Sequence, residues 1–158
     1  MQPVVLATSN RHKIEEISLY LKDTGFLFRS VSEFPGYPDP EETGNTFEAN
    51  ARLKAAAAAA FTGLSSLADD SGLVVPALGG EPGVKSARWA GPGCTQPMLI
   101  EKLQRRMRGK AERSAWFETV LVLQREASPT LVARGRVLGR ILAEPRGGLG
   151  FGYDPLFV

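Results

Sequence analysis

Cysteine and histidine are almost absent: the 158 residues include one of each, Cys94 and His12. One cysteine cannot form a disulfide within the chain, and structural zinc sites need about four cysteine or histidine ligands. An internal disulfide and a zinc site built only from these residues are therefore excluded. Serine-hydrolase chemistry is also poorly supported, because His12 is the only candidate base and no G-x-S-x-G segment occurs.

Long apolar runs are missing as well. The longest, residues 55–61, is far shorter than the ~20 residues that span a bilayer. The first residues lack the basic start and long apolar stretch of a signal peptide, so we expect a cytoplasmic protein with no membrane partner. With 43% hydrophobic and 23% charged residues, the composition is typical of a soluble globular chain, and we expect one domain over residues 1–158.

Charge is unevenly distributed although the net charge is only +2. Residues 30–51 contain no lysine or arginine but several acidic residues, whereas residues 101–113 contain six basic and two acidic ones. The basic stretch could bind nucleic acid. A solvated helix face is the preferred interpretation, because no aromatic residues are interleaved to stack on bases, and we expect no nucleic-acid partner.

The N-terminal pattern predicts a strand, a polar loop and a helix. Residues 4–7 are a continuous apolar run typical of a buried strand, and the loop 8–13 precedes a helical pattern that ends near Gly25. Ser9 and Asn10 are good N-cap residues, so the loop should present backbone N–H groups beside Lys13. We expect a phosphate there, although neither G-x-x-x-x-G-K-[ST] nor G-x-G-x-x-G is present.

A second helix is predicted after an acidic, proline-rich loop. The segment Asn45-x-x-Glu48 resembles a capping box before the alanine run 55–60. Helical spacing places Lys54 on one stripe with Phe47, Ala51, Ala58 and Phe61, with Asn50 at its margin. Because burying an ammonium group is costly, we expect Lys54 to meet a carboxylate or a phosphate; the alternative is that it extends to solvent past the alanines.

The remaining segments predict an α/β domain around one sheet. Apolar runs at 64–68 and 73–78 flank Asp69-Asp70-Ser71-Gly72, which is predicted to be a turn or a strand edge. Residues 97–107 are predicted to form a helix. Residues 116–123 and 131–138 are predicted to form an antiparallel pair of strands.

Four carboxylates lie at predicted loop or strand-end positions: Glu41, Glu42, Asp69 and Asp70. Adjacent acids that share a pocket need a compensating cation. Without histidine or cysteine partners, the natural ion is Mg²⁺ or Mn²⁺. The alternative is that these pairs are ordinary surface or turn residues.

Five motifs together resemble the non-canonical purine nucleoside triphosphate pyrophosphatases, the inosine/xanthosine triphosphatase family. They occur in the family's order and span nearly the whole chain. They are T-S-N-x-x-K at 8–13, E-E-T-G-x-T-F-x-x-N-A-x-x-K at 41–54, A-D-D-S-G-L at 68–73, P-G-V-x-S-A-R at 82–88 and G-F-G-Y-D-P at 150–155.

The resemblance implies Mg²⁺-dependent hydrolysis of ITP, dITP and XTP to the monophosphate and pyrophosphate. It implies an α/β fold with two lobes around a long central mixed sheet flanked by helices, a substrate cleft between the lobes, and a homodimer. The family continues for a few dozen residues past the glycine-rich motif, so we expect a C-terminally truncated chain. The alternatives are a catalytically impaired nucleotide-binding protein and a pyrophosphatase of pyrimidine or modified nucleotides.

The resemblance also assigns roles to the motif residues. Asp70 would position or deprotonate the attacking water, Lys13 and Lys54 would contact phosphate, and Glu41 or Glu42 would bind metal with Asp70. A metal and lysines lower the barrier by neutralising developing charge. The expected substrate contacts are Thr8, Ser9, Asn10, Arg11, His12, Lys13, Ser71, Phe151, Gly152, Tyr153 and Asp154. For Phe151 and Tyr153, packing beneath the glycine loop is the alternative.

Overall fold

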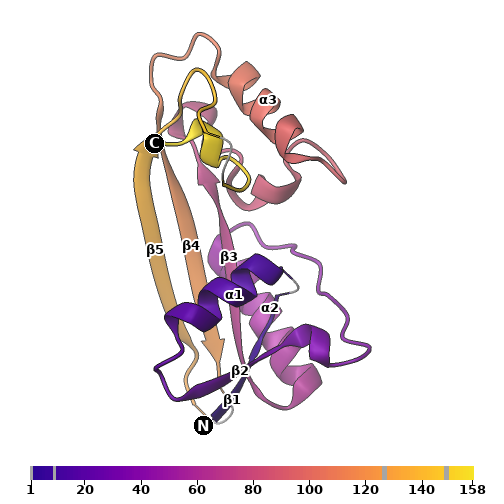
Figure 1. The fold of residues 1–158 in the computed structure, drawn as a ribbon. Helices are drawn as coiled ribbons and strands as arrows, with labels where there is room; N and C mark the ends of the chain where they lie inside the picture. The colour runs from indigo at the N-terminus through magenta and orange to yellow at the C-terminus, as the bar shows by residue number, and fades with distance from the viewer. Residues whose placement is uncertain (1, 9, 126–127, 148–149) are drawn as a thin grey trace. The chain divides into compact units, whose positions relative to one another are not determined.

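The computed structural model describes residues 2–8, 10–125, 128–147 and 150–158. Five strands form one open sheet in the order β2-β1-β3-β4-β5, and helices flank it (Figure 1). Strand β1 (Gln2–Leu6) pairs in parallel with β2 (Phe26–Ser30) and with β3 (Ser65–Val74). Strands β4 (Ser114–Gln124) and β5 (Leu131–Arg140) are neighbours that run in opposite directions (Figure 1). The predicted α/β class with a mixed sheet is confirmed.

The chain forms two compact units, and β3, β4 and β5 contribute residues to both. Unit 1 comprises Met1–Asp70 and Val120–Arg134, and unit 2 comprises Ser71–Thr119 and Gly135–Val158. The resemblance implies two lobes, and these units agree with it. The substrate cleft stays a prediction.

Unit 1 contains α1 (Arg11–Tyr20) and α2 (Phe47–Thr62). Strand β1 lies between β2 and β3 in the sheet. Its residues Val4, Val5 and Leu6 are almost fully buried, as expected for an apolar run covered on both faces. Alanine favours α2, which ends at Gly63 in the left-handed conformation, with its N–H donating to the Ala59 carbonyl.

Unit 2 contains α3 (Gln96–Met107) and a separate apolar core. Leu99, Leu103 and Met107 recur every four residues and form the buried face of α3. They pack with apolar residues from β3 and from the C-terminal segment, including Leu73 and Leu156. The predicted helix at 97–107 is confirmed.

Four local predictions were wrong. Helix α1 ends at Tyr20 rather than near Gly25. The N-cap of α2 is Thr46 rather than Asn45, and its hydroxyl accepts a 3.1 Å hydrogen bond from Ala49 N. Phe61 is 45% exposed, whereas Asn50 is fully buried, so the inner face of α2 is rotated from the predicted stripe. The segment Asp69-Asp70-Ser71-Gly72, predicted to be a turn or a strand edge, is instead the middle of β3, which continues without a break from Ser65 to Val74.

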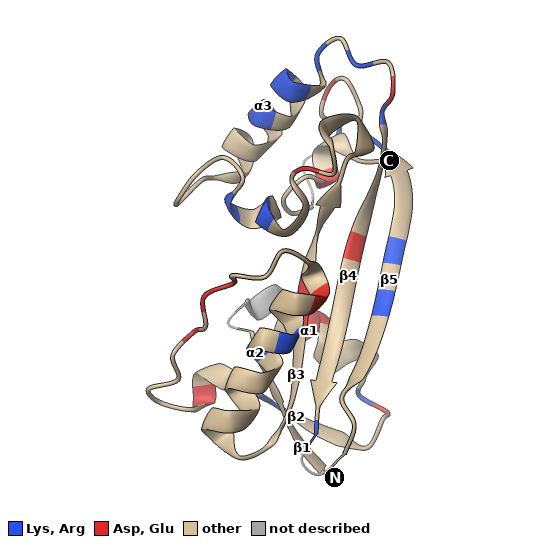
Figure 2. Ribbon diagram, turned by 180° about the vertical axis from the view of Figure 1, so that it is seen from behind, with Lys and Arg blue, Asp and Glu red and all other residues tan. Residues whose placement is uncertain are grey.

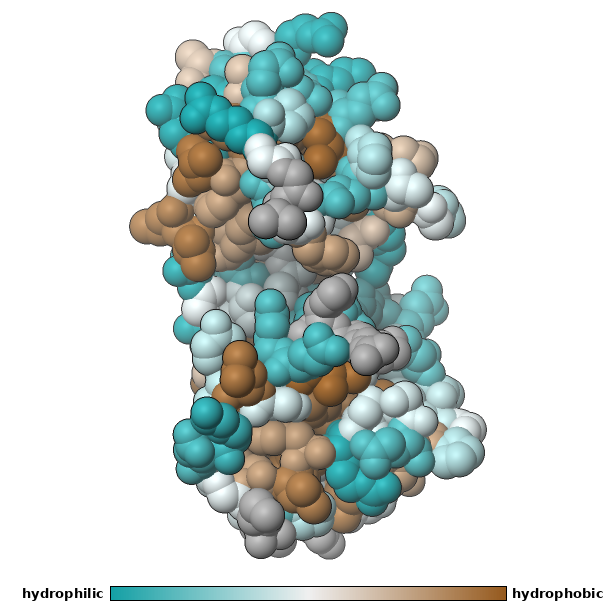
Figure 3. All heavy atoms as spheres, viewed as in Figure 1, coloured by the Kyte–Doolittle hydropathy of each residue, from teal (hydrophilic) through white to brown (hydrophobic). Residues whose placement is uncertain are grey.

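Hydrophobic side chains also reach the surface as separate patches among hydrophilic residues (Figure 3). The large hydrophobic residues that are exposed include Leu27 in unit 1 and Leu138 and Phe151 in unit 2. Within the described ranges, no helix has the length and apolar character needed to span a bilayer.

Candidate active site

Lys54 is the centre of a polar cluster in unit 1. Its side chain is 12% exposed, and Nζ lies 2.9 Å from Glu42 Oε1 and 4.0 Å from Asp70 Oδ1. Figure 2 shows acidic residues along the loop before α2 and on β3, and a basic residue on α2. The prediction that Lys54 meets a carboxylate is confirmed. Two carboxylates, those of Glu42 and Asp70, therefore lie near the Lys54 ammonium group.

Asp70 is buried in the same cluster, with 6% of its surface exposed. Its Oδ2 accepts a 3.0 Å hydrogen bond from Asn50 Nδ2. Burial raises the pKa of the Asp70 carboxyl, and the negative charge of Glu42 adds to this; the Asn50 hydrogen bond and the positive charges of Lys54 and Lys13 oppose it. Asp70 is therefore a stronger base than an exposed aspartate.

A second ion pair joins the start of α1 to β3. Lys13 Nζ lies 2.5 Å from Asp69 Oδ2, and Asp69 is only 3% exposed. The positive charge of Lys13 also acts on Asp70, so this pair lies near the contacts of Lys54 with Glu42 and Asp70. These five residues are called the cluster below. The formal charges of these five side chains sum to one net negative charge.

The predicted phosphate loop is built as a helix N-terminus. The Asn10 side chain accepts a 3.4 Å hydrogen bond from Lys13 N, and Thr8 Oγ1 accepts one of 3.2 Å from Asn10 N. Asn10 is thus confirmed as a capping residue of α1. The first turn of α1 directs N–H groups and the positive end of the helix dipole toward this loop.

The two glutamates before α2 have different environments. Glu42 is half-buried and bound to Lys54, whereas Glu41 is exposed. Among the residues that the structure describes, no three acidic, histidine or cysteine side chains are gathered as a metal site. Glu42 and Asp70 together fit Mg²⁺ chemistry, because this ion typically takes one or two carboxylates and completes its shell with water and phosphate oxygens.

The glycine-rich loop belongs to unit 2. Asp154 Oδ2 accepts a 2.8 Å hydrogen bond from Phe151 N, and Gln96 Nε2 donates a 3.0 Å bond to the Gly152 carbonyl. A Cβ at position 150 would lie 2.8 Å from Asp154 Cβ, so glycine is needed there. The loop holds Phe151 with 70% of its surface exposed, as a contact to substrate would require.

Tyr153 is packed differently from Phe151. The residue is 3% exposed within the apolar core of unit 2, and its hydroxyl donates a 2.8 Å hydrogen bond to the Ser86 carbonyl. Burial raises the pKa of the Tyr153 hydroxyl well above its ordinary value. The packing alternative is shown for Tyr153, and its contact with substrate stays a prediction.

The remaining predicted substrate residues of the N-terminal loop and β3 are Ser9, Arg11, His12 and Ser71. Ser71 follows Asp70 in β3 and is half-buried. Ser9 and the side chains of Arg11 and His12 lie outside the part of the chain that the structure describes.

Sequence reasoning did not assign roles to Asn50 and Asp69 in the cluster. Asn50 lies one helical turn before Lys54, so both side chains face β3. This spacing could have predicted that Asn50 belongs to the cluster. Asp69 was grouped with the other acids, but its partner Lys13 lies 56 residues away, and only the parallel pairing of β1 with β3 brings them together.

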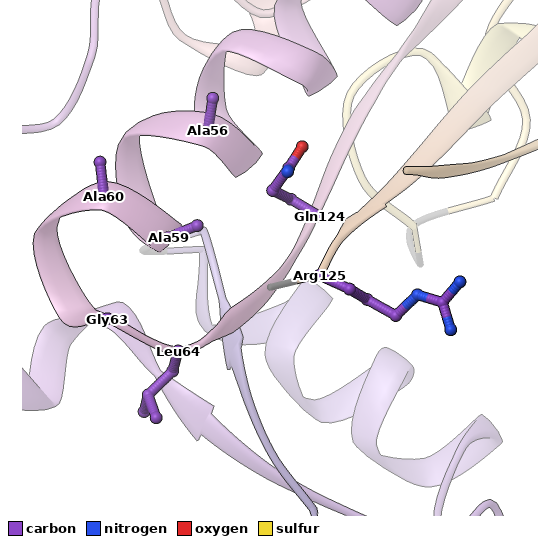
Figure 4. Close-up of a pocket in the computed structure, with 7 residues that line it drawn as sticks. All are labelled: Ala56, Ala59, Ala60, Gly63, Leu64, Gln124 and Arg125. Carbon is purple, nitrogen blue, oxygen red and sulfur yellow. The ribbon is translucent and has the colours of Figure 1, made fainter. Parts of the chain in front are cut away.

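A cavity of about 370 Å³ lies at the other end of α2 (Figure 4). Ala56, Ala59 and Ala60 line it with Gly63, Leu64, Gln124 and Arg125. Figure 4 shows the Arg125 guanidinium group pointing away from the alanines. The cavity contains none of the predicted site residues and no carboxylate, so it does not have the chemistry of the cluster.

Several basic residues of the stretch 101–113 form contacts within unit 2. Lys102 donates to the Trp89 carbonyl, Arg106 pairs with Glu81 at 2.9 Å, and Arg113 donates to the Ile141 carbonyl at 2.7 Å. These contacts give three of the six cations structural partners, which disfavours the nucleic-acid interpretation.

Known proteins resemble this chain over almost its whole length. The sequence profile of the Ham1 family matches residues 4–158. The chain belongs to the Ham1 family. The predicted resemblance is thereby confirmed, since relatives in it are named dITP/XTP pyrophosphatase.

Ham1 relatives align over almost the entire chain. The dITP/XTP pyrophosphatase of Desulfotalea psychrophila is 46% identical over 154 residues, covering 98% of this chain and 69% of the relative. That of Vibrio parahaemolyticus is 48% identical over 161 residues, covering 99% and 80%. The structure of a HAM1 protein from Coxiella burnetii superposes with a TM-score of 0.94 at 43% identity, covering 99% of this chain and 81% of that one.

Proposed function

We propose that this Ham1 chain hydrolyses non-canonical purine nucleoside triphosphates, such as dITP, ITP and XTP, to the monophosphate and pyrophosphate. The observation that carries the proposal is the cluster of Lys13, Glu42, Lys54, Asp69 and Asp70 beside a helix N-terminus. Its ammonium groups suit a polyphosphate, and its acids suit a divalent ion and a water nucleophile. The printed names of the relatives support the purine substrates.

In this mechanism Asp70 receives the proton of the attacking water. Oxygen of that water bonds to the α-phosphorus, the bond from that phosphorus to the bridging oxygen breaks, and pyrophosphate leaves. Burial favours this role because it raises the pKa of Asp70 and makes the carboxylate a better base. Lys54 lies beside the carboxylates and stabilises negative charge that develops on the phosphoryl oxygens.

The N-terminal loop would bind the rest of the triphosphate. The N–H groups of the first turn of α1 and the Lys13 ammonium group supply donors and positive charge. A polyphosphate that reaches Lys13 competes with Asp69 for it. Phe151, exposed on the glycine loop of unit 2, would contribute to the base pocket.

Magnesium is part of the proposal. Glu42 and Asp70 would hold the ion, and Glu41, which is exposed, would not. When bound, Mg²⁺ neutralises charge on the phosphates and lowers the pKa of bound water. The homodimer and the cytoplasmic location stay predictions.

A substrate panel tests the function. The protein is incubated with Mg²⁺ and dITP, ITP, XTP, GTP, ATP, UTP or TTP, and pyrophosphate and orthophosphate are measured separately. We expect pyrophosphate mainly from dITP, ITP and XTP. Orthophosphate as the main product, or equal turnover of ATP and GTP, would contradict the proposal; preference for UTP or TTP would favour the pyrimidine alternative.

A further inference from the structure

Asn50 occupies the point where α2, β3 and the loop before α2 meet. It is 0% exposed. Its Nδ2 donates a 3.0 Å hydrogen bond to Asp70 Oδ2, and its Oδ1 accepts one of 2.7 Å from Gly44 N. One amide group therefore connects the proposed base to the loop that carries Glu42.

The two hydrogen bonds need an amide in one orientation. Asp70 requires a donor and Gly44 N requires an acceptor, and an asparagine side chain provides one at each end. Asp70 Oδ2 is bound to this amide, whereas Oδ1 is the atom that lies 4.0 Å from Lys54 Nζ. Asn50 thus fixes the orientation of the Asp70 carboxylate, with the other oxygen toward Lys54.

Gly44 permits the close approach from the loop side. A Cβ at position 44 would lie 2.6 Å from Asn50 Oδ1 and 2.8 Å from Ala49 Cβ. The Gly44 N–H can therefore reach the amide only because the residue has no side chain. Since Gly44 follows Glu42 by two residues, this contact also holds Glu42 near Lys54.

We propose that Asn50 is a positioning residue that aligns Asp70 and Glu42 for the metal and the attacking water. It acts through these two residues and contacts neither phosphate nor base. Its loss would impair the chemical step and divalent-ion binding and would leave nucleotide binding at the Lys13 loop largely intact. This inference rests on the proposed function.

Two variants break the connection from opposite sides. Asn50→Asp keeps the acceptor for Gly44 N but replaces the donor to Asp70 with a carboxylate. Gly44→Ala keeps Asn50 but forces the loop away from it. Asn45→Asp is the matched control, because it adds the same charge at an exposed position of the same loop.

We expect kcat with dITP and Mg²⁺ to fall about 10–100-fold in both variants, as is typical when a partner of a metal ligand is lost, with KM for dITP within about threefold of the parent. Mn²⁺ binding, measured by electron paramagnetic resonance without nucleotide, should weaken about 10-fold or more. Asn45→Asp should change neither quantity. Unchanged kcat and Mn²⁺ affinity in both variants, or an equal loss in Asn45→Asp, would overturn the proposal.

A double variant separates positioning from loss of folding. Asn50→Asp combined with Asp70→Asn restores one amide and one carboxylate at the same contact, so we expect recovery of the thermal midpoint without recovery of turnover. Turnover stays low in any case, because Asp70→Asn alone removes the proposed base; a thermal midpoint that does not recover would overturn the amide–carboxylate contact. If the parent protein releases no pyrophosphate, the proposed function fails, and Mn²⁺ affinity still tests Asn50.

Discussion

The interiors of the two units differ in kind. Unit 2 is closed by apolar side chains, with Leu73, Leu103 and Leu156 fully buried in one core. Unit 1 buries polar groups beside its apolar residues, notably Asn50, Ser66, Asp69 and Asp70. Apolar burial stabilises a fold, whereas burying a carboxylate costs free energy unless partners offset it. The apolar interior of unit 2 can account for its stability, and the buried polar groups of unit 1 include residues of the proposed site.

The first prediction removes the cation from the polar interior. Lys54→Met keeps the length of the side chain but leaves Glu42 and Asp70 without the ammonium group. We expect kcat with dITP and Mg²⁺ to fall about 100–1,000-fold, because charge developing on phosphate is no longer stabilised. Lys22→Met, at an exposed position of unit 1, is the control. A fall of less than threefold in Lys54→Met would remove Lys54 from the mechanism.

The second prediction concerns the apolar interior. Leu103→Ala removes a fully buried side chain from α3 and leaves a cavity in the core of unit 2. We expect the free energy of unfolding to fall by about 2–5 kcal/mol, measured by urea denaturation. Met98→Ala, on the exposed side of the same helix, should cost much less. Equal losses in the two variants would contradict the assignment of this core.

The third prediction uses pH to show the cost of burying Asp70. Because burial raises its pKa in the folded state, stability falls as pH rises from below the unfolded pKa through the folded pKa. Asp70→Asn removes this loss and still offers an oxygen to Asn50. In metal-free buffer, its gain in stability should be absent near about pH 3, where both states are protonated, and complete at neutral pH.

Urea midpoints across this range measure the effect, with Asp23→Asn, at an exposed position, as the control. An Asp70→Asn variant that is less stable than the parent at neutral pH would show that Asp70 contributes to stability rather than costing it.

The smallest effect is expected at Tyr153. Tyr153→Phe keeps the ring in the core of unit 2 but leaves the Ser86 carbonyl without its hydrogen bond. We expect a loss of about 0.5–1.5 kcal/mol in the free energy of unfolding. KM for dITP tests the predicted substrate contact at the same time: an increase of tenfold would support that contact, and no change would leave Tyr153 with packing alone.

Local sequence patterns predicted much of the fold but not the continuity of β3. The apolar runs of β1 and α3 are visible because burial follows the period of the element. Asp69-Asp70-Ser71-Gly72 has the composition of a turn, and only the pairing of β3 with both β1 and β4 shows that it is the middle of a strand. Thr46 and Asn45 are both good caps, so the pattern alone could not place the first residue of α2.

The sequence could predict that buried lysines of the site pair with acidic residues, but not which acidic residue pairs with which lysine. A lysine among alanines on an inner face indicates a buried counter-ion, and Glu42 and Asp70 supply it. Glu41 and Glu42 are equivalent in the sequence and differ only because the loop turns one of them toward Lys54. The role of Asn50 depends on Gly44 and Asp70, six residues before it and twenty after it, which no helical or strand period connects.

The most direct test of the central claim, that the polar interior of unit 1 is the catalytic site, is pyrophosphate release from dITP by Asp70→Asn beside the parent protein. Both proteins are first shown by circular dichroism and urea denaturation to be folded. We predict that kcat falls about 1,000-fold or more, as loss of a general base and metal ligand requires, while the free energy of unfolding at neutral pH is maintained or increased. A folded Asp70→Asn protein that releases pyrophosphate at the rate of the parent would contradict the claim.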